Sequence, residues 1–255
     1  MTRVTMTVED GVADVRLSRA DKLNALDAAM FAEIAATIDR IAALAEVRAV
    51  VVSGEGRGFC AGLDMAAMAG GGSGLLTTER THGPANLVQH VAWGWRALPQ
   101  PVIAALHGVA LGGGLQMAAG ADIRIAHPET RLSVRELYWG IVPDMAGYAL
   151  WRGTVRDDHL REAIYTAREF AAPEAERLGF VTRLADEPLA EALALARTIA
   201  GRSPAAIRAA KRLAAIEGDV AVVLAAETAE QQRLLGTAEQ IEQVRANMEK
   251  RVPQF

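Results

Sequence analysis

The chain has 255 residues, of which 51% are hydrophobic, and a formal net charge of −4. This length and composition permit one large domain, or one domain with a small appendage, around a sizeable core. The absence of a basic stripe argues against nucleic acid as the main ligand, and the single cysteine, Cys60, excludes an intramolecular disulfide framework and a cysteine-rich metal site.

The first part of the chain alternates strand and helix patterns. Residues 4–8 and 12–17 alternate apolar and polar side chains around a Glu-Asp-Gly turn, which predicts a β-hairpin. Asp27 is placed to cap a helix, and residues 48–54 predict a strand buried on both faces, as in a parallel sheet. The apolar positions of that helix recur at helical spacing: Phe31, Ile34, Ile38, Ile41 and Leu44. The start of the chain has no cationic segment before an apolar block, so we expect no signal peptide and a cytoplasmic protein.

The middle of the chain continues this alternation. Residues 70–78, GGGSGLLTT, form a low-complexity stretch that predicts a mobile loop, and residues 81–98 carry apolar side chains at helical spacing. Residues 102–106 predict a buried strand, which a glycine-rich turn connects to a helix from about Leu115. A further strand is expected over residues 122–126.

After about residue 145 the sequence becomes mostly helical, with one short strand expected within residues 180–184. Ser203, followed by proline, predicts a helix start. Thr237 with Gln240 predicts a capping box at the start of the last helix. Early strand–helix alternation followed by helices indicates an α/β core with a helical C-terminal extension.

The sequence motifs for dinucleotide binding, phosphate binding, nucleophilic catalysis and metal binding are incomplete or absent in this chain. Gly54, Gly56 and Gly58 lack the following helix and acidic residue of a dinucleotide site, and no Walker loop or G-x-S-x-G elbow is present. The histidines have no metal-ligand spacing, so no metal site is expected. Cys60 is interpreted as a packed hydrophobe, although a Cys–His pair stays open. Residues 102–121 are nearly uncharged, but their five glycines favour a strand, a turn and a buried helix over a membrane span.

Two glycine-rich loops form the main candidate site. Residues 59–65, FCAGLDM, and residues 111–116, LGGGLQ, each follow a buried strand. Backbone N–H donors from two such loops make an oxyanion hole, and a helix beginning at the triple glycine would add its positive end. Tight packing of the helix against a strand explains the glycines equally well.

Four ordered motifs resemble the crotonase superfamily, the enoyl-CoA hydratases and isomerases, from about Val12 to Gly147: RADKLNAL, SGEGRGFCAGLDM, PVIAALHGVALGGGLQMAAGADIRIA and RLSVRELYWGIVPDMAG. The resemblance implies an α/β fold in which ββα units form a spiral, with an acyl-CoA-binding core over residues 1–200. The helical region over residues 201–255 also resembles the family and would build homotrimers, often stacked as dimers of trimers. The implied substrate is an acyl-CoA thioester, with no metal or redox cofactor and no nucleic-acid or membrane partner.

The resemblance also assigns residues. The backbone N–H groups of Leu63 and Gly113 would form the oxyanion hole. The residues expected to contact substrate or coenzyme A are Lys22, Ala61, Asp64, Met65 and Ala66. A solvated loop lysine is an equally good interpretation of Lys22.

One position departs from the family hydratases, which add water with two glutamates. One glutamate aligns with Glu136, but Gln116 occupies the position of the other, and an amide is not a proton shuttle at neutral pH. Asp144, which resembles the second acid of family isomerases and hydrolases, supplies an alternative carboxylate. We therefore expect Glu136 and Asp144 to be catalytic, with Gln116 and Trp139 in the pocket. Apolar neighbours such as Trp139 would raise the pKa of one carboxyl.

The favoured reaction is a double-bond shift in an enoyl- or dienoyl-CoA through a thioester enolate. Three alternatives stay open. They are 2-enoyl-CoA hydration with glutamine in place of one glutamate, thioester hydrolysis, and a non-catalytic protein that binds acyl-CoA.

Overall fold

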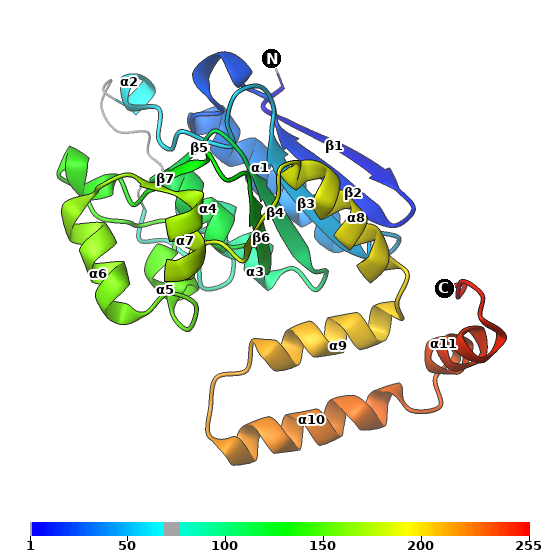
Figure 1. Ribbon diagram of the computed structural model, residues 1–255. Helices are drawn as coiled ribbons and strands as arrows, with labels where there is room; N and C mark the ends of the chain where they lie inside the picture. Colours follow the sequence, from blue (N-terminus) through cyan, green and yellow to red (C-terminus); the bar gives the residue numbers. More distant parts are fainter. Residues whose placement is uncertain (1, 69–76) are drawn as a thin grey trace.

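A six-stranded sheet lies at the centre of the computed structural model, which describes residues 2–68 and 77–255 (Figure 1). The strand order is β1-β2-β3-β4-β6-β9; β1 and β2 form the predicted antiparallel hairpin, and the other neighbours pair in parallel. The strands are β1 (Val4–Glu9), β2 (Val12–Leu17), β3 (Ala49–Gly54), β4 (Val102–Leu106), β6 (Ile123–Ala126) and β9 (Arg183–Leu184). The predicted loop over residues 70–78 lies outside the described residues except for its last two.

A second sheet of three short strands, in the order β5-β7-β8, accompanies the first. These strands are β5 (Val109–Leu111), β7 (Arg131–Ser133) and β8 (Phe170–Ala171). Along the chain, β4 of the large sheet is followed by β5 of the small sheet, and β6 is followed by β7 in the same way. Each of these repeats of the spiral therefore contributes one strand to each sheet. The expected α/β fold of successive ββα turns is confirmed. Sequence patterns did not predict the second sheet, because strands of two or three residues show no periodicity.

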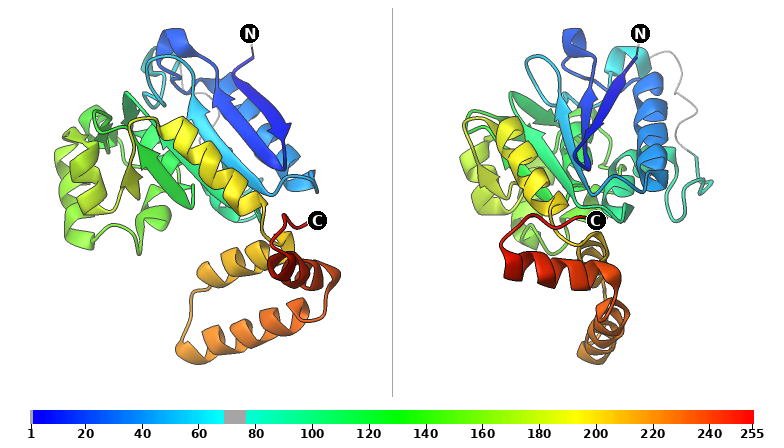
Figure 2. Two further views of the ribbon diagram at one scale, coloured as in Figure 1. Left: turned by 45° about the vertical axis from the view of Figure 1, so that its right-hand side comes forward. Right: turned by 90° about the vertical axis from the view of Figure 1, so that its right-hand side faces the viewer.

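Helices cover both faces of the large sheet. Helices α1 (Ala28–Ala43) and α3 (Leu87–Ala97) pack together on one face, and α8 (Pro188–Ala200) covers the other (Figure 2). Successive residues of β3 alternate between the two apolar cores, because side chains of a strand point to opposite faces. Both faces are therefore buried, as the apolar strand sequences predicted.

Two predicted helix starts are shifted. Helix α3 begins at Leu87 rather than Thr81, because Asn86 and Gln89 form a capping box in which Asn86 Oδ1 accepts from Gln89 N (2.9 Å) and Gln89 Oε1 accepts from Asn86 N (3.1 Å). Helix α4 (Gly113–Ala119) begins within the triple glycine instead of at Leu115.

The remaining helices fall into two groups: short helices between the strands, and three C-terminal helices that extend away from the sheet. The short helices are η1 (Ala20–Lys22), α2 (Met65–Met68), η2 (Glu136–Trp139), α5 (Gly147–Trp151), α6 (Asp157–Thr166) and α7 (Ala172–Leu178). Helices α9 (Pro204–Ala214), α10 (Val220–Leu234) and α11 (Ala238–Glu249) project beyond the sheet (Figures 1 and 2). Within the described residues, no helix is long and apolar enough to cross a membrane.

The predicted caps of the C-terminal helices form. Ser203 accepts from the N–H of Ala206 (3.3 Å), and Thr237 accepts from the N–H of Gln240 (3.3 Å). The capping box at Thr237 is incomplete, because the Gln240 side chain accepts from the N–H of Gly236 instead of that of Thr237.

Candidate active site

The two glycine-rich loops meet η2 around a cavity of about 40 Å³. Its lining combines predicted and unpredicted residues: Ala61, Gly62, Leu63, Met65, Gly112, Gly113, Arg135, Glu136, Trp139 and Ile141. A cleft of about 420 Å³ lies between the hairpin and α8, but no predicted site residue lines it. The smaller cavity is therefore the candidate site, because it alone of the two combines a carboxylate with both predicted N–H donors.

Backbone pairing fixes the first loop. Leu26 and Leu63 form an isolated parallel bridge in which Leu26 N–H donates to Gly62 O (2.8 Å) and Asp64 N–H donates to Leu26 O (3.0 Å). These bonds use the groups on either side of Leu63, the carbonyl oxygen of Gly62 and the N–H of Asp64, so the Leu63 N–H is directed away from the bridge. Gly62 (φ +88°) brings this loop against the second one, since a Cβ there would lie 3.4 Å from the nitrogen of Gly113.

The triple glycine has both a conformational and a packing requirement, and it leaves one backbone donor without an acceptor in its helix. Gly112 has φ +50°, a left-handed conformation that favours glycine, and a Cβ on Gly114 would lie 2.4 Å from the carbonyl oxygen of Cys60. The backbone conformation thus favours glycine at position 112, and close packing requires it at position 114. Gly113 opens α4, so its N–H has no acceptor within the helix and remains available to a ligand.

Gln116 and Glu136 form a buried pair behind the cavity. The Gln116 side chain, 0% exposed, donates from Nε2 to Glu136 Oε1 (2.6 Å). Its Oε1 accepts from the backbone N–H groups of Met145 (2.9 Å) and Gly147 (3.1 Å). Two backbone donors require an oxygen at that end, so the amide has one acceptable orientation.

This orientation assigns separate roles to the two carboxyl oxygens of Glu136. Because Gln116 Nε2 is a donor, Glu136 Oε1 acts as an acceptor and carries no proton. Glu136 Oε2 is buried and has no hydrogen-bond partner among the described residues. Oε2 is therefore the oxygen that gains or loses a proton.

Both candidate carboxyls have raised pKa values. Burial is the main cause of the raised pKa of Glu136, the charge of Asp144 adds to it, and hydrogen bonds that include the one from Gln116 oppose it. Partial removal from solvent raises the pKa of Asp144, although the residue as a whole is exposed and solvent limits the effect. Asp144 thus lies close enough to raise the pKa of Glu136, but it does not line the cavity.

Other predicted residues lie outside the cavity lining. Asp64 forms an ion pair with Arg19 (2.7 Å), Lys22 is exposed on η1, and Ala66 is exposed on α2. Gln116 lies behind Glu136 and does not line the cavity.

Cys60 is a core residue, as the sequence indicated. Its Sγ donates to the carbonyl oxygen of Asn24 (3.1 Å), and burial raises its pKa to about 12. A thiol in this state is a poor nucleophile at neutral pH.

Arg135, which sequence patterns did not single out, forms part of the cavity wall. It pairs with Glu169 (2.8 Å), and its guanidinium lies 4.5 Å from the ring centre of Tyr138. The only sequence feature that could have indicated Arg135 as a site residue is its position next to Glu136. Its pairing with Glu169, 34 residues away, could not be predicted from the sequence.

Comparison with known proteins connects this geometry to a family. Residues 7–255 match the enoyl-CoA hydratase/isomerase family. The chain is 34% identical over 247 residues to YngF of Bacillus subtilis, named as an enoyl-CoA hydratase/isomerase, covering 94% of this chain and 92% of that protein. It is 33% identical to the mitochondrial Delta(3,5)-Delta(2,4)-dienoyl-CoA isomerase of Rattus norvegicus, covering 78% of this chain and 64% of that protein.

Solved structures give the same result. The crystal structure of enoyl-CoA hydratase from Bacillus anthracis superimposes with a TM-score of 0.88 at 29% identity, covering 99% of this chain and 98% of that chain. The crotonase fold expected from the sequence motifs is thus confirmed over the whole length of the chain.

Proposed function

This chain belongs to the enoyl-CoA hydratase/isomerase family, and from that premise we propose that it shifts a double bond along the acyl chain of an enoyl- or dienoyl-CoA. One observation carries the choice of isomerisation. The partner of Glu136 is an amide held by three hydrogen bonds, so a second glutamate is missing where hydration would use it. The similarity to a dienoyl-CoA isomerase supports the same choice.

The thioester oxygen of the substrate would accept hydrogen bonds from the N–H groups of Leu63 and Gly113. Both residues line the cavity beside Glu136. These donors stabilise the negative charge that the oxygen gains as the enolate forms, and loss of one such donor typically costs about 10²–10³ in rate. The geometry thus lowers the barrier to removing a proton next to the thioester carbonyl.

Proton transfer would begin at Glu136. As a carboxylate, it takes a proton from the acyl carbon through Oε2, while Gln116 holds Oε1 in place. The C–H electron pair enters the enolate, and Asp144 in its acid form donates a proton to the more distant carbon as the double bond moves. Glu136 then releases its proton to solvent and Asp144 takes one up from solvent, which restores both groups without another reactant.

Deuterium incorporation tests this mechanism. Incubation with 3-enoyl-CoA and 3,5-dienoyl-CoA in heavy water should give rearranged products that carry deuterium at the carbon protonated last. Absence of both isomerisation and exchange across chain lengths would contradict the proposal.

Two alternative reactions, hydration and thioester hydrolysis, can each be measured by a separate assay. Hydration of 2-enoyl-CoA is the second candidate, because relatives in the comparison are named hydratases, and loss of the crotonyl-CoA absorbance measures it. Released coenzyme A, detected as free thiol, measures thioester hydrolysis. A protein that binds acyl-CoA but gives no signal in any of these assays would be a non-catalytic binder.

Coenzyme A would enter as part of the substrate. We place it against Ala61, Met65 and Ala66, with Asp64 held by Arg19 and Lys22 nearby in the chain to approach the phosphates. The proposed proton transfers use carboxylates and backbone N–H groups, so neither a metal nor a redox cofactor takes part. The cytoplasmic location remains a prediction.

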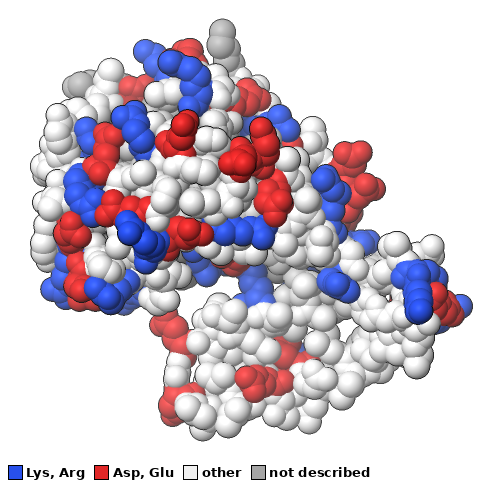
Figure 3. Space-filling model, in the orientation of Figure 1, with Lys and Arg blue, Asp and Glu red and all other residues white. Residues whose placement is uncertain are grey.

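The C-terminal helices would form the surface of a homotrimer, with a dimer of trimers as the larger assembly. Exposed apolar side chains gather on α10, α11 and the segments beside them: Val220, Val222, Leu224, Leu235, Ile241, Val244, Met248 and Val252. Figure 3 shows few charges over α9 and α10, whereas both signs are interspersed over the core. Sedimentation equilibrium should give three or six chains per particle, and a monomer at micromolar concentration would contradict the assembly.

A further inference from the structure

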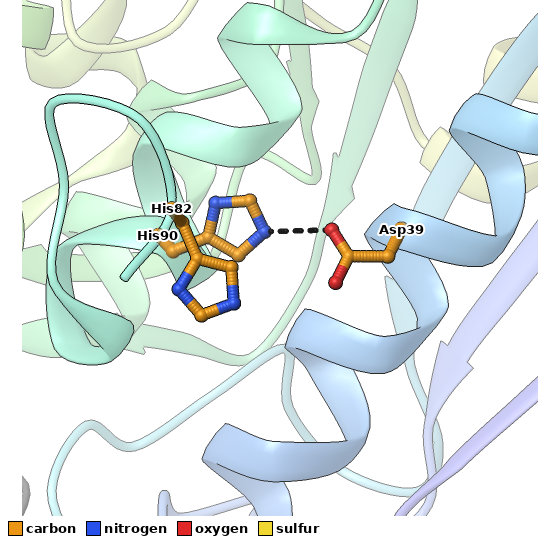
Figure 4. A group of neighbouring side chains, drawn as sticks. All are labelled: Asp39, His82 and His90. Atoms are coloured by element: carbon orange, nitrogen blue, oxygen red, sulfur yellow. Dashed lines mark ion pairs between the residues drawn. The ribbon is translucent and has the colours of Figure 1, made fainter. Parts of the chain in front are cut away.

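Three potential metal ligands meet on the side of the molecule formed by α1 and α3. Asp39 belongs to α1, His90 belongs to α3, and His82 precedes α3 (Figure 4). Their ligand atoms all lie within 4.8 Å of one another. None of the three lines the active-site cavity.

The imidazole of His90 lacks the hydrogen bond that a buried imidazole normally makes. The residue is 8% exposed, and its Nε2 has no hydrogen-bond partner among the described residues. Asp39 Oδ1 lies 3.3 Å from Nε2, and the two form an ion pair only if His90 is protonated (Figure 4). Burying a polar atom without a hydrogen-bond partner lowers the stability of the folded state. A bound ligand that pairs with His90 Nε2 would remove this cost.

His82 can supply a second nitrogen. Its Nδ1 lies 2.8 Å from Thr81 Oγ1, and that contact leaves Nε2 for another partner when Nδ1 carries the proton. The ring stacks on His90 with centroids 4.1 Å apart and planes 19° apart (Figure 4). Metal binding would require the His82 side chain to turn so that a nitrogen faces the space between His90 and Asp39, and its half-buried position leaves it room to do so.

We propose that Asp39, His82 and His90 bind a divalent transition-metal ion, with zinc as the ion that fits best. Zinc takes imidazole nitrogens and carboxylate oxygens at about 2.0–2.2 Å, and tetrahedral ligands at that distance lie about 3.3 Å apart. The present separation of His90 Nε2 and Asp39 Oδ1 equals this value. Water would occupy the fourth position, since the Asp39 side is open to solvent.

The charge state of the cluster suits a cation. The His90 imidazole, when neutral, has a lone pair on Nε2 to donate to a metal ion. The carboxylate of Asp39 neutralises part of the charge of the ion. The Thr81 hydroxyl would orient His82 in the way that outer partners orient metal-bound histidines.

The ion would be structural and not catalytic. It would join α1 to the segment that carries Pro84 and Ala85, which line an apolar cavity of about 230 Å³ with residues of α3 and α5. Ala146, between the two backbone groups that bind Gln116, lines the same cavity. Metal occupancy would therefore set the position of one wall of this apolar cavity.

Calorimetric titration of untagged, metal-free protein with Zn²⁺ tests the site. We expect one ion per chain, and Asp39→Asn or His82→Gln should weaken binding by more than the roughly 10–100-fold that loss of an outer partner costs. Thr81→Val should weaken it by about 10-fold. Both ligand variants change accessible positions, so circular dichroism should show an unchanged fold. Co²⁺ should give the visible absorption of a four-coordinate site with nitrogen ligands.

His159→Gln is the matched control, because His159 lies on α6 outside the cluster and its replacement should leave the titration unchanged. The proposal is overturned if the wild type binds Zn²⁺ no more tightly than the Asp39→Asn and His82→Gln variants. The same holds if His159→Gln removes the binding. In either case the cluster is a pair of stacked imidazoles beside a solvated carboxylate.

Discussion

Two polar clusters in this protein, one half-buried beneath α9 and one buried in the candidate active site, differ in how completely their polar atoms are paired. Where α9 meets the sheet, Asp122 Oδ2 accepts from Lys211 Nζ (2.7 Å) and from the N–H of Val102 (2.8 Å). Lys211 also donates to the carbonyl oxygens of Gln100 (2.8 Å) and Trp95 (3.3 Å), so its three donors are satisfied. In the active site, Gln116 is held by three hydrogen bonds, but Glu136 Oε2 has no partner among the described residues.

The electrostatic surroundings also differ. Burial lowers the pKa of Lys211, and the opposite charge of Asp122 counteracts this effect. Burial raises the pKa of Glu136, and the like charge of Asp144 increases the effect. A complete set of partners stabilises a structure, whereas one unpartnered oxygen beside a like charge leaves a group ready to exchange a proton. Four variants test this distinction.

Glu136→Gln should have the largest effect. It removes the proton acceptor but preserves the shape and an acceptor for the Gln116 amide, so isomerisation and deuterium exchange should fall about 10²–10⁴-fold, the usual contribution of general acid–base catalysis. Turnover of 3-enoyl-CoA and 3,5-dienoyl-CoA measures the loss. Unchanged turnover would remove Glu136 from the mechanism and erase the distinction between the clusters.

Lys211→Met should affect stability instead of chemistry. It leaves Asp122 with only the more distant Arg96 (4.0 Å) as a cation, which should lower the free energy of unfolding by about 1–3 kcal/mol, since Asp122 loses a charged hydrogen-bond donor. Guanidinium chloride unfolding measures the change. Turnover per folded molecule should stay at the wild-type value, and a specific loss of kcat would show that this cluster is not merely structural.

Gln116→Leu should combine both effects at a smaller size. The N–H groups of Met145 and Gly147 lose their acceptor, which should cost about 1–3 kcal/mol of stability. Glu136 also loses a donor that lowers its pKa, so the acid limb of the kcat/KM profile should move to higher pH.

Gln116→Glu is the matched comparison for this variant. The new side chain keeps an acceptor for the two N–H groups but adds a like charge beside Glu136. It should therefore retain more stability than Gln116→Leu while moving the acid limb in the same direction. An acid limb that stays in place in both variants would contradict the positioning role of Gln116.

The smallest expected effect is on the pH dependence of stability. Folding raises the pKa of Glu136, so the stability that this group contributes is complete below its unfolded pKa and is lost as the pH rises through its folded pKa. Glu136→Gln should therefore gain stability relative to the wild type between pH 5 and pH 8. Urea unfolding at the two pH values measures the gain, and a difference that does not grow with pH would show that the buried carboxylate carries no penalty.

The sequence by itself determined the local features of the fold. The hairpin, the helix capped by Asp27 and the starts at Ser203 and Thr237 follow from periodicity and capping over a few residues. The ordered motifs also identified the family, and with it Glu136 and the two glycine-rich loops. These features can be recognised in a single sequence because each depends on residues that are close together in the chain.

Only the tertiary structure decided which polar atoms have partners. The direction of the Gln116 amide depends on the N–H groups of Met145 and Gly147, which come from a segment about 30 residues further along the chain. The expectation of no metal site rested on histidine spacing along the chain, whereas His90 meets a carboxylate from another helix. Hydrogen bonds and ion pairs form between side chains that are close in space. Folding brings together residues far apart in the chain, and their spacing in the sequence does not indicate that they will meet.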